Sequence, residues 1–176
     1  MTVSNTLFPT LETMHTLMPQ LAESYASLKA DVCRRGSLYD ILYGTPFCAA
    51  TMSLGPCEET THHRDHKNEA AGACVVAPFG AFDPIRGGHI VLHEPKVVVQ
   101  LNPGDLLFLS ACITHETLHV DPQEQRSSLT LYTSEALLQW VKCDHRSLGD
   151  LPNEIPDAGS STTAGAKSDH ASNDRA

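Results

Sequence analysis

The stretch Ser127-Ser128-Leu129-Thr130-Leu131-Tyr132-Thr133 decides the fold class, because polar and apolar side chains alternate along it. Alternation with a period of two predicts a β-strand with one face toward an apolar core. Arg126 precedes the stretch and falls on its polar side together with Ser128. An inward-facing guanidinium needs an anion, since burying an unpaired charge is costly. A guanidinium beside a hydroxyl suits a carboxylate, so the strand predicts a site for an acidic group.

Five further stretches have the length and composition of strands, and turns rich in Gly, Pro and Asp separate them. They are Phe47–Leu54, Ala73–Phe79, Gly88–Leu92, Lys96–Leu101 and Asp105–Leu109. Many short strands with tight turns are typical of a sandwich or a barrel. The double-stranded β-helix, or jelly roll, is the member of this group that presents metal ligands from inward strand positions. We therefore expect a mainly β, cupin-like core over residues 38–147.

The segment before this core reads as helical. Apolar residues recur at helical spacing from Leu11 to Leu28, and Pro19 interrupts the stripe. A proline inside a helix removes a backbone hydrogen bond and clashes with the preceding turn. We therefore predict two helices within residues 1–37, packed on the core. Their expected spans are about 10–17 and 19–33.

The end of the chain has a different composition. Ser134 is a candidate N-cap for a short helix that reaches Trp140. After about Arg146, small and polar residues dominate and large apolar residues are rare. Such a composition cannot bury enough apolar surface to fold, so residues 148–176 are expected to be disordered.

The sequence Thr61-His62-His63-Arg64-Asp65 carries the clearest candidate metal ligands. His63 and Asp65 are two residues apart, so on an extended segment their side chains leave from one face. A third candidate, His115, follows His63 by 52 residues. Two histidines and one carboxylate form the facial triad that leaves open positions on non-haem Fe(II). Arg126 lies 11 residues after His115, about one turn and one strand away, and would anchor a keto-acid beside the metal.

Other histidines have weaker claims to a metal. His62 and His66 flank the pair but have no carboxylate at the right offset, so they are expected to be solvated or to lie around the ligands. His89 and His93 are four apart and share a strand face, which leaves a ligand role open. His119 would pair with His115 on a helix, but this segment lacks a helical stripe and indicates strand and turn.

Composition sets the broad class of protein. A length of 176 residues and 41% apolar composition fit one domain with a real core. No apolar run approaches the roughly 18 residues of a membrane helix, and no secretory signal is visible. The six cysteines show no paired C-x-x-C spacing, which argues against disulfides and a zinc ribbon. We expect an intracellular protein that does not bind membranes, and the sequence does not indicate its oligomeric state.

The charge of the chain does not favour a broad nucleic-acid surface. The net charge is −9, and residues 1–147 alone hold 10 Lys and Arg against 16 Asp and Glu. Proteins that grip duplex phosphates normally present a basic face. The largest basic cluster here is Arg34-Arg35. A contact with nucleic acid would therefore be small and local, or would need a partner.

Several motifs together resemble one enzyme family. From about Leu42 to Val141 the chain is similar to 2-oxoglutarate/Fe(II)-dependent dioxygenases of the TET/JBP type, especially the transposon-associated basidiomycete branch. The matching text comprises His63-Arg64-Asp65, Asn68, Phe82-Asp83-Pro84, Gly87-Gly88-His89-Ile90-Val91-Leu92, Pro103-Gly104, His115, Glu124-Gln125-Arg126-Ser127-Ser128, Leu129-Thr130-Leu131-Tyr132 and Leu138-Gln139-Trp140-Val141. HxD alone is a weak signal, but the distant His, the R-x-S and the Gly-Gly-His run make the combination specific.

The resemblance implies an activity and its cofactors. Fe(II) would be held by His63, Asp65 and His115, with 2-oxoglutarate and O2 as co-substrates. The distal carboxylate of 2-oxoglutarate would pair with Arg126 and Ser128. Asn68 would orient the co-substrate or the substrate, and a simple turn-forming role fits it equally well.

The family suggests the methyl group of 5-methylcytosine in nucleic acid as the substrate, with the base flipped into the pocket. Candidate residues for stacking on the base are Phe79, Phe82 and Tyr132, all of which also suit a core. A nuclear location follows if this reading holds, and a cytoplasmic one otherwise. Two alternatives stay open: a catalytically silent, cupin-like remnant of a transposon-encoded oxygenase, and an oxygenase that acts on a protein or small molecule.

Overall fold

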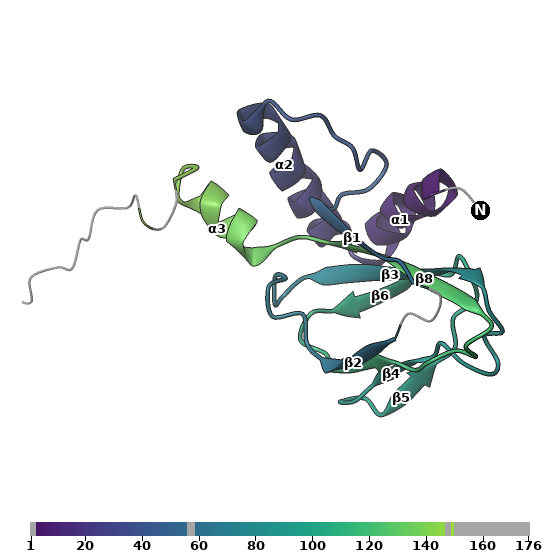
Figure 1. Cartoon of the computed structure of the whole chain (residues 1–176). Helices are drawn as coiled ribbons and strands as arrows, with labels where there is room; N and C mark the ends of the chain where they lie inside the picture. The colour runs from purple at the N-terminus through teal and green to yellow at the C-terminus, as the bar shows by residue number, and fades with distance from the viewer. Residues whose placement is uncertain (1–2, 56–58, 147–148, 150–176) are drawn as a thin grey trace, which may run out of the picture.

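A computed structural model describes residues 3–55, 59–146 and 149, with side chains from Thr10 onward. The expected disordered tail from 148 lies outside the described residues, except for Gly149, and the predicted limits of the three regions stay a prediction. Figure 1 shows a helical layer, a sheet beneath it and a second sheet below. Among the described residues, no helix is long and apolar enough to cross a membrane.

Two helices open the chain, as predicted. Helix α1 spans Val3–Leu17 and helix α2 spans Pro19–Gly36, so the break falls at Met18. Pro19 is the first residue of α2, where its missing N–H costs no intrahelical hydrogen bond. Helix α1 begins earlier than expected, and α2 ends later, at Gly36, followed by Ser37 in the left-handed conformation with φ 49°.

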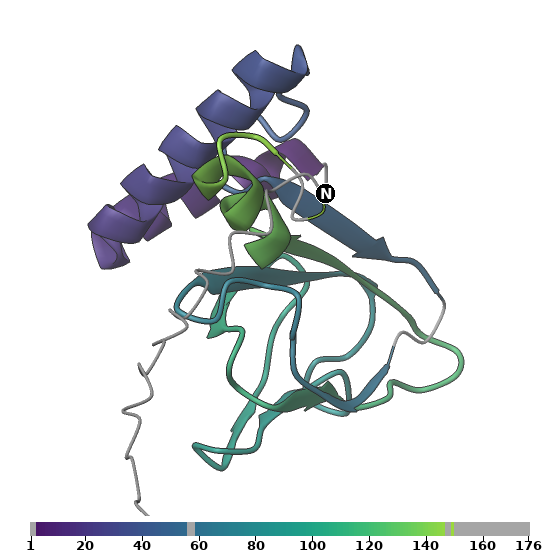
Figure 2. The same ribbon diagram turned by 90° about the vertical axis from the view of Figure 1, so that its left-hand side faces the viewer.

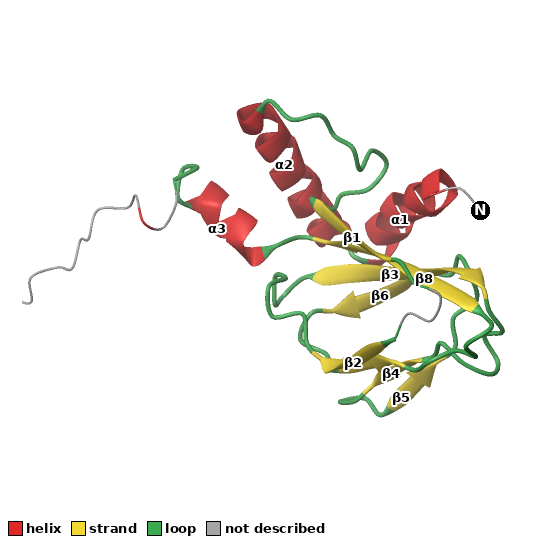
Figure 3. Cartoon of the chain, in the orientation of Figure 1, coloured by secondary structure: helices red, strands yellow, loops and turns green. Residues whose placement is uncertain are grey.

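In the part of the chain that the structure describes, eight strands form two antiparallel four-stranded sheets (Figure 3). They are β1 (Ala49–Ser53), β2 (Thr60–His63), β3 (Ala73–Ala81), β4 (Ile90–Leu92), β5 (Val97–Val99), β6 (Leu107–Ser110), β7 (His115–Thr117) and β8 (Gln125–Tyr132). The major sheet has the order β1-β8-β3-β6 and the minor sheet has the order β2-β7-β4-β5. Consecutive strands thus pass repeatedly from one sheet to the other. This interleaved order is that of a double-stranded β-helix, which confirms the predicted fold.

The major sheet separates two apolar clusters. On its outer side Tyr25 from α2 meets Phe47, and their rings pack edge to face with centroids 5.7 Å apart. Leu129 and Leu131 of β8 face this cluster, while Ser128 and Thr130 face the space between the sheets. The second cluster lies between the sheets and comprises Cys74, Val76, Ile90, Leu92, Leu101 and Leu109. Helices therefore cover one face of the major sheet, and the minor sheet covers the other (Figure 2).

A third helix, α3 (Glu135–Lys142), follows β8 at once, as expected. Ser134 stands at its N-cap in an extended conformation, but its side chain makes no capping hydrogen bond. The end of α3 is held to α2 through His145, whose Nε2 lies 2.6 Å from Asp31 Oδ2. The ring of His145 also packs against Trp140, with centroids 4.6 Å apart.

The strand prediction was incomplete in the minor sheet. All six predicted stretches contain a strand, although β4 begins at Ile90, after Gly88 with φ 72°. Strands β2 and β7 were not among the predicted stretches. They are only four and three residues long and read TTHH and HET, without an alternating apolar pattern. These two strands nevertheless carry both candidate histidine ligands.

Candidate metal centre and adjoining cavity

The minor sheet brings the two histidines of the predicted triad together. His63 ends β2 and His115 begins β7, and the two are paired in the antiparallel register. Directly opposite residues share a face of the sheet, so both rings point into the space between the sheets. Their ring centroids are 4.4 Å apart. A contact across two strands thus joins residues that are far apart in the sequence.

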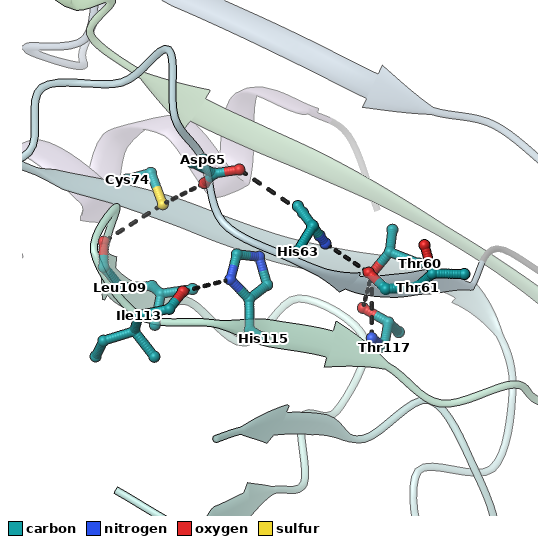
Figure 4. Close-up of polar contacts among 9 residues, drawn as sticks. All are labelled: Thr60, Thr61, His63, Asp65, Cys74, Leu109, Ile113, His115 and Thr117. Atoms are coloured by element: carbon teal, nitrogen blue, oxygen red, sulfur yellow. Dashed lines mark hydrogen bonds and ion pairs between the residues drawn. The ribbon is translucent and has the colours of Figure 1, made fainter. Parts of the chain in front are cut away.

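Asp65 reaches the same point from the loop that follows β2. One of its carboxylate oxygens, Oδ1, lies 3.7 Å from His63 Nε2. Ligand atoms of His63, Asp65 and His115 all lie within 4.8 Å of one another. Within the described parts of the chain, no other group of three His, Cys, Asp or Glu meets that criterion. Figure 4 shows the three side chains converging.

Backbone carbonyls orient both imidazole rings. The oxygen of Thr61 lies 2.7 Å from His63 Nδ1, and the oxygen of Ile113 lies 3.0 Å from His115 Nδ1. A carbonyl oxygen only accepts hydrogen bonds, so in each ring Nδ1 carries the proton and donates. Nε2 is then left with a lone pair, which is the form that binds a metal. In both cases the carbonyl belongs to the residue two positions before the histidine.

The second carboxylate oxygen of Asp65 meets the thiol of Cys74 from β3. The distance from Sγ to Oδ2 is 3.6 Å, and Sγ also lies 3.3 Å from the oxygen of Leu109 (Figure 4). Burial, aided by the Asp65 carboxylate, raises the pKa of Cys74 to about 12. The thiol therefore keeps its proton and serves as a donor. Nothing in the spacing of the cysteines along the sequence indicates this contact.

The donor set fits non-haem Fe(II). Two imidazole nitrogens and one carboxylate oxygen on one side of a metal leave positions open for other ligands. The open side faces a cavity of about 440 Å³ between the two sheets. Its polar wall on the major sheet is formed by Thr51, Ser53, Ser128, Thr130 and Tyr132, and the triad lies across from it.

Arg126 lies at the start of β8 and has no exposed surface. It is on the same face of the strand as Ser128, which lines the cavity, whereas Arg126 itself lies outside the set of lining residues. Its guanidinium carbon is 5.7 Å from the centre of the Phe82 ring. A Cβ at Gly88 would come within 2.9 Å of Arg126 Cδ and Nε. The glycine of the Gly-Gly-His run therefore makes room for the buried arginine.

Asn68 has the turn-forming role that the sequence left open, and it also lies at the cavity. Its backbone N–H donates to the oxygen of Asp65 at 2.9 Å and closes a turn. The residue forms an isolated β-bridge with Ser134 and also lines the cavity. Contact with a co-substrate stays a prediction.

The candidate stacking residues separate in the structure. Phe79 packs against the cluster under the helices, and Phe82 packs on Arg126. Tyr132 lines the cavity. Of the three aromatic candidates, Tyr132 is thus the one that a substrate in the cavity could meet.

Arg64, which lines the cavity, and Arg86, in the turn before β4, are already paired with carboxylates. Arg64 contacts Glu94, and Arg64 Nε donates to Thr114 Oγ1 at 2.6 Å. Hydrogen bonds from Thr114 and Arg64 lower the pKa of Glu94 to about 2. Arg86 pairs with Asp83 at 2.9 Å, and it also pairs with Glu124. The cavity lining includes two Lys or Arg side chains, Arg64 and Lys67, and the charge of Arg64 is compensated by Glu94.

Comparisons with known proteins give no match to a family model or to a curated protein sequence. Solved structures with partial similarity include "NgTET1 in complex with 5mC DNA", at 16% identity and a TM-score of 0.45 over 69% of this chain and 54% of that one. A 2OG-Fe(II) oxygenase family protein from Burkholderia pseudomallei is 26% identical over 48% of this chain and 40% of that one, with a TM-score of 0.37. A Pseudomonas putida prolyl-4-hydroxylase is 16% identical over 73% of this chain and 94% of that one, with a TM-score of 0.40. The chain thus spans about half the length of the first of these structures.

Proposed function

We propose that this chain is an Fe(II)- and 2-oxoglutarate-dependent dioxygenase that hydroxylates a C–H bond. The observation that carries the proposal is the convergence of His63, Asp65 and His115 at the wall of the cavity. With Fe(II), 2-oxoglutarate and O2 bound, such a site couples oxidative decarboxylation of the keto-acid to hydroxylation of the substrate. The protein supplies binding, orientation and exclusion of water.

His63, Asp65 and His115 hold the metal in this proposal. Both imidazoles are fixed with Nε2 toward the metal position by the carbonyls of Thr61 and Ile113. Asp65 contributes the single negative charge, and Cys74 restrains the oxygen that faces away from His63. Ligands fixed in advance lose little freedom on binding, which raises affinity for the metal.

Arg126 and Ser128 hold the distal carboxylate of 2-oxoglutarate in this proposal. The support is their shared face on β8, together with the match in geometry between a planar guanidinium and a carboxylate. Ser128, two residues after Arg126 on β8, lines the same cavity as the three candidate metal ligands. Asn68, on the opposite loop, would orient the co-substrate or the substrate.

For the substrate, we propose the methyl group of 5-methylcytosine in nucleic acid, on the strength of the family resemblance. Tyr132 supports a planar ligand in the cavity, because it offers an aromatic surface beside the polar wall. A base would have to leave its stack to reach this depth. Since Arg64 and Arg86 are already paired, phosphate contacts would be few and unaided binding to DNA weak.

The same pairing favours a second candidate, an oxygenase that acts on a protein side chain or a small molecule. Such substrates need no row of phosphate contacts, and the chain is acidic, with a net charge of −9. A catalytically silent remnant is the third possibility. It is distinguished from both enzymes by whether the site binds metal and keto-acid together.

Nucleoside mass spectrometry tests the substrate. Single- and double-stranded methylated oligonucleotides are incubated with the protein, Fe(II), ascorbate and 2-oxoglutarate, and Asp65→Ala serves as the inactive control. Oxidised forms of 5-methylcytosine are the expected products. Succinate without a modified base would contradict the nucleic-acid substrate and favour the second candidate, and no succinate at all would contradict the enzyme.

A further inference from the structure

The outer face of the minor sheet carries a second set of metal-binding side chains. His62 directly precedes His63, and Glu116 directly follows His115. Successive side chains of a strand point to opposite faces, so His62 and Glu116 project away from the triad. His93 comes directly after β4, and its backbone N–H donates to the oxygen of Thr114 at 2.9 Å, which extends the β4–β7 pairing. The three residues therefore lie on or directly beside the neighbouring strands β2, β7 and β4.

The side chains of these three residues are in contact. The rings of His62 and His93 pack edge to face, with centroids 4.3 Å apart. His93 Nε2 lies 3.4 Å from Glu116 Oε1. This nitrogen is shielded from solvent and has no hydrogen-bond partner among the described residues. A polar atom that is buried without a partner costs free energy, and a cation between the imidazole and the carboxylate would remove that cost.

We propose that His93, Glu116 and His62 bind a divalent cation of the Zn²⁺ class at this outer face. Zn²⁺ takes imidazole nitrogens and carboxylate oxygens in a tetrahedral arrangement, with water able to fill the fourth position. His93 and Glu116 are already in place. The ligand atoms of the three residues do not yet meet as closely as those of the triad. His62 is exposed, so its ring is free to turn toward the other two.

Binding at this site would link β2, β7 and β4. These strands are short, and their inner faces carry the two histidines of the triad. A cation that binds only the folded sheet stabilises it by mass action. The outer site would therefore brace the scaffold of the triad without contributing a ligand to it. This inference does not depend on the proposed oxygenase activity.

The experiment uses the full chain with Asp65→Ala, so that the triad has lost its carboxylate and the outer site is measured alone. Zn²⁺ alone is titrated by calorimetry in a buffer that does not bind metals. We expect one Zn²⁺ per chain and a rise in the melting temperature with Zn²⁺. Adding His93→Ala or Glu116→Gln should weaken this binding at least about tenfold, because each change removes a direct ligand. Adding His15→Ala, an exposed histidine on α1, should change nothing.

The same Zn²⁺ titration is carried out on the wild-type chain. It should bind two Zn²⁺ per chain, and His93→Ala should bind one. Equal Zn²⁺ affinity in Asp65→Ala with and without His93→Ala would overturn the proposal, as would the absence of Zn²⁺ binding to Asp65→Ala. Circular dichroism of each variant without metal checks that a loss of binding does not arise from unfolding.

Discussion

The two sheets of this protein divide stability and chemistry between them. Strands β3 and β8 of the major sheet are nine and eight residues long, and Val75 and Leu131 are buried between them and the helices. Strands β2 and β7 of the minor sheet are four and three residues long and hold polar side chains. The two candidate histidine ligands stand on the short strands and Asp65 follows β2, while the major sheet supplies the opposite wall. A well-buried sheet can thus support a site built on a sheet with little core of its own.

The first prediction separates the sheets by stability. Leu131→Ala removes a buried side chain that is 1% exposed under the helices and should lower the free energy of unfolding by about 2–5 kcal/mol. Val98→Ala on β5 of the minor sheet, where the side chain is 59% exposed, should change it by less than about 0.5 kcal/mol. Urea unfolding followed by circular dichroism measures both. Similar losses of unfolding free energy in the two variants would contradict the view that the major sheet provides most of the stability.

The second prediction concerns the metal. Asp65→Ala removes the only anionic ligand of the triad, so affinity for Mn²⁺, used in place of Fe(II), should fall at least about 100-fold, roughly 2.7 kcal/mol. Calorimetric titration measures it. His119→Ala, which alters an exposed histidine outside the triad, is the matched control and should bind as the wild type does. An unchanged affinity in Asp65→Ala would remove Asp65 from the site.

The third prediction concerns Arg126, at the start of β8 in the major sheet. Arg126→Lys keeps the charge but loses the paired geometry of the guanidinium. The apparent requirement for 2-oxoglutarate should rise at least about tenfold, roughly 1.4 kcal/mol, with metal affinity nearly unchanged. Succinate release at varied 2-oxoglutarate concentration gives the value, and Arg35→Lys on the exposed end of α2 is the control. Loss of metal binding without a co-substrate effect would assign Arg126 a structural role.

The fourth prediction concerns the contact between Cys74 of the major sheet and Asp65 beside the minor sheet. Cys74 stands on β3 but contacts the carboxylate of Asp65. Cys74→Ala should weaken Mn²⁺ binding about tenfold, since partners of metal ligands typically contribute such factors, and Cys74→Ser should restore part of it by supplying a donor. Mn²⁺ titration is paired with thermal unfolding, to separate affinity from stability. Equal metal affinities in the Ala and Ser variants would show that the thiol acts through packing alone.

The major sheet could be predicted from the sequence because its strands alternate over many residues. Strand β8 shows this most clearly. Its apolar residues Leu129 and Leu131 alternate with the polar residues Ser128 and Thr130, which indicates one apolar and one polar face. Strands β2 and β7 lack that signal, since tertiary pairing and not local pattern makes them strands. The spacing of His63 and Asp65 still identified their side chains as neighbours.

Other parts of the site had no signal in the sequence. Cys74 meets Asp65 only because β3 passes under the loop after β2. The contact of Phe82 with Arg126, and the pairing of Arg64 with Glu94, likewise depend on segments that are distant in the chain. Contacts of this kind follow from the sheet topology, which spacing along one strand does not contain.

In the proposed function, the triad and the polar residues of β8 form one site for Fe(II) and a keto-acid. Anaerobic addition of Fe(II) and 2-oxoglutarate to the wild-type chain, followed by visible absorption, tests whether they do. We expect a weak charge-transfer band that requires both additions, is lost in Asp65→Ala and needs more 2-oxoglutarate in Arg126→Lys. A folded wild-type chain that gives no band at saturating Fe(II) and 2-oxoglutarate would contradict it.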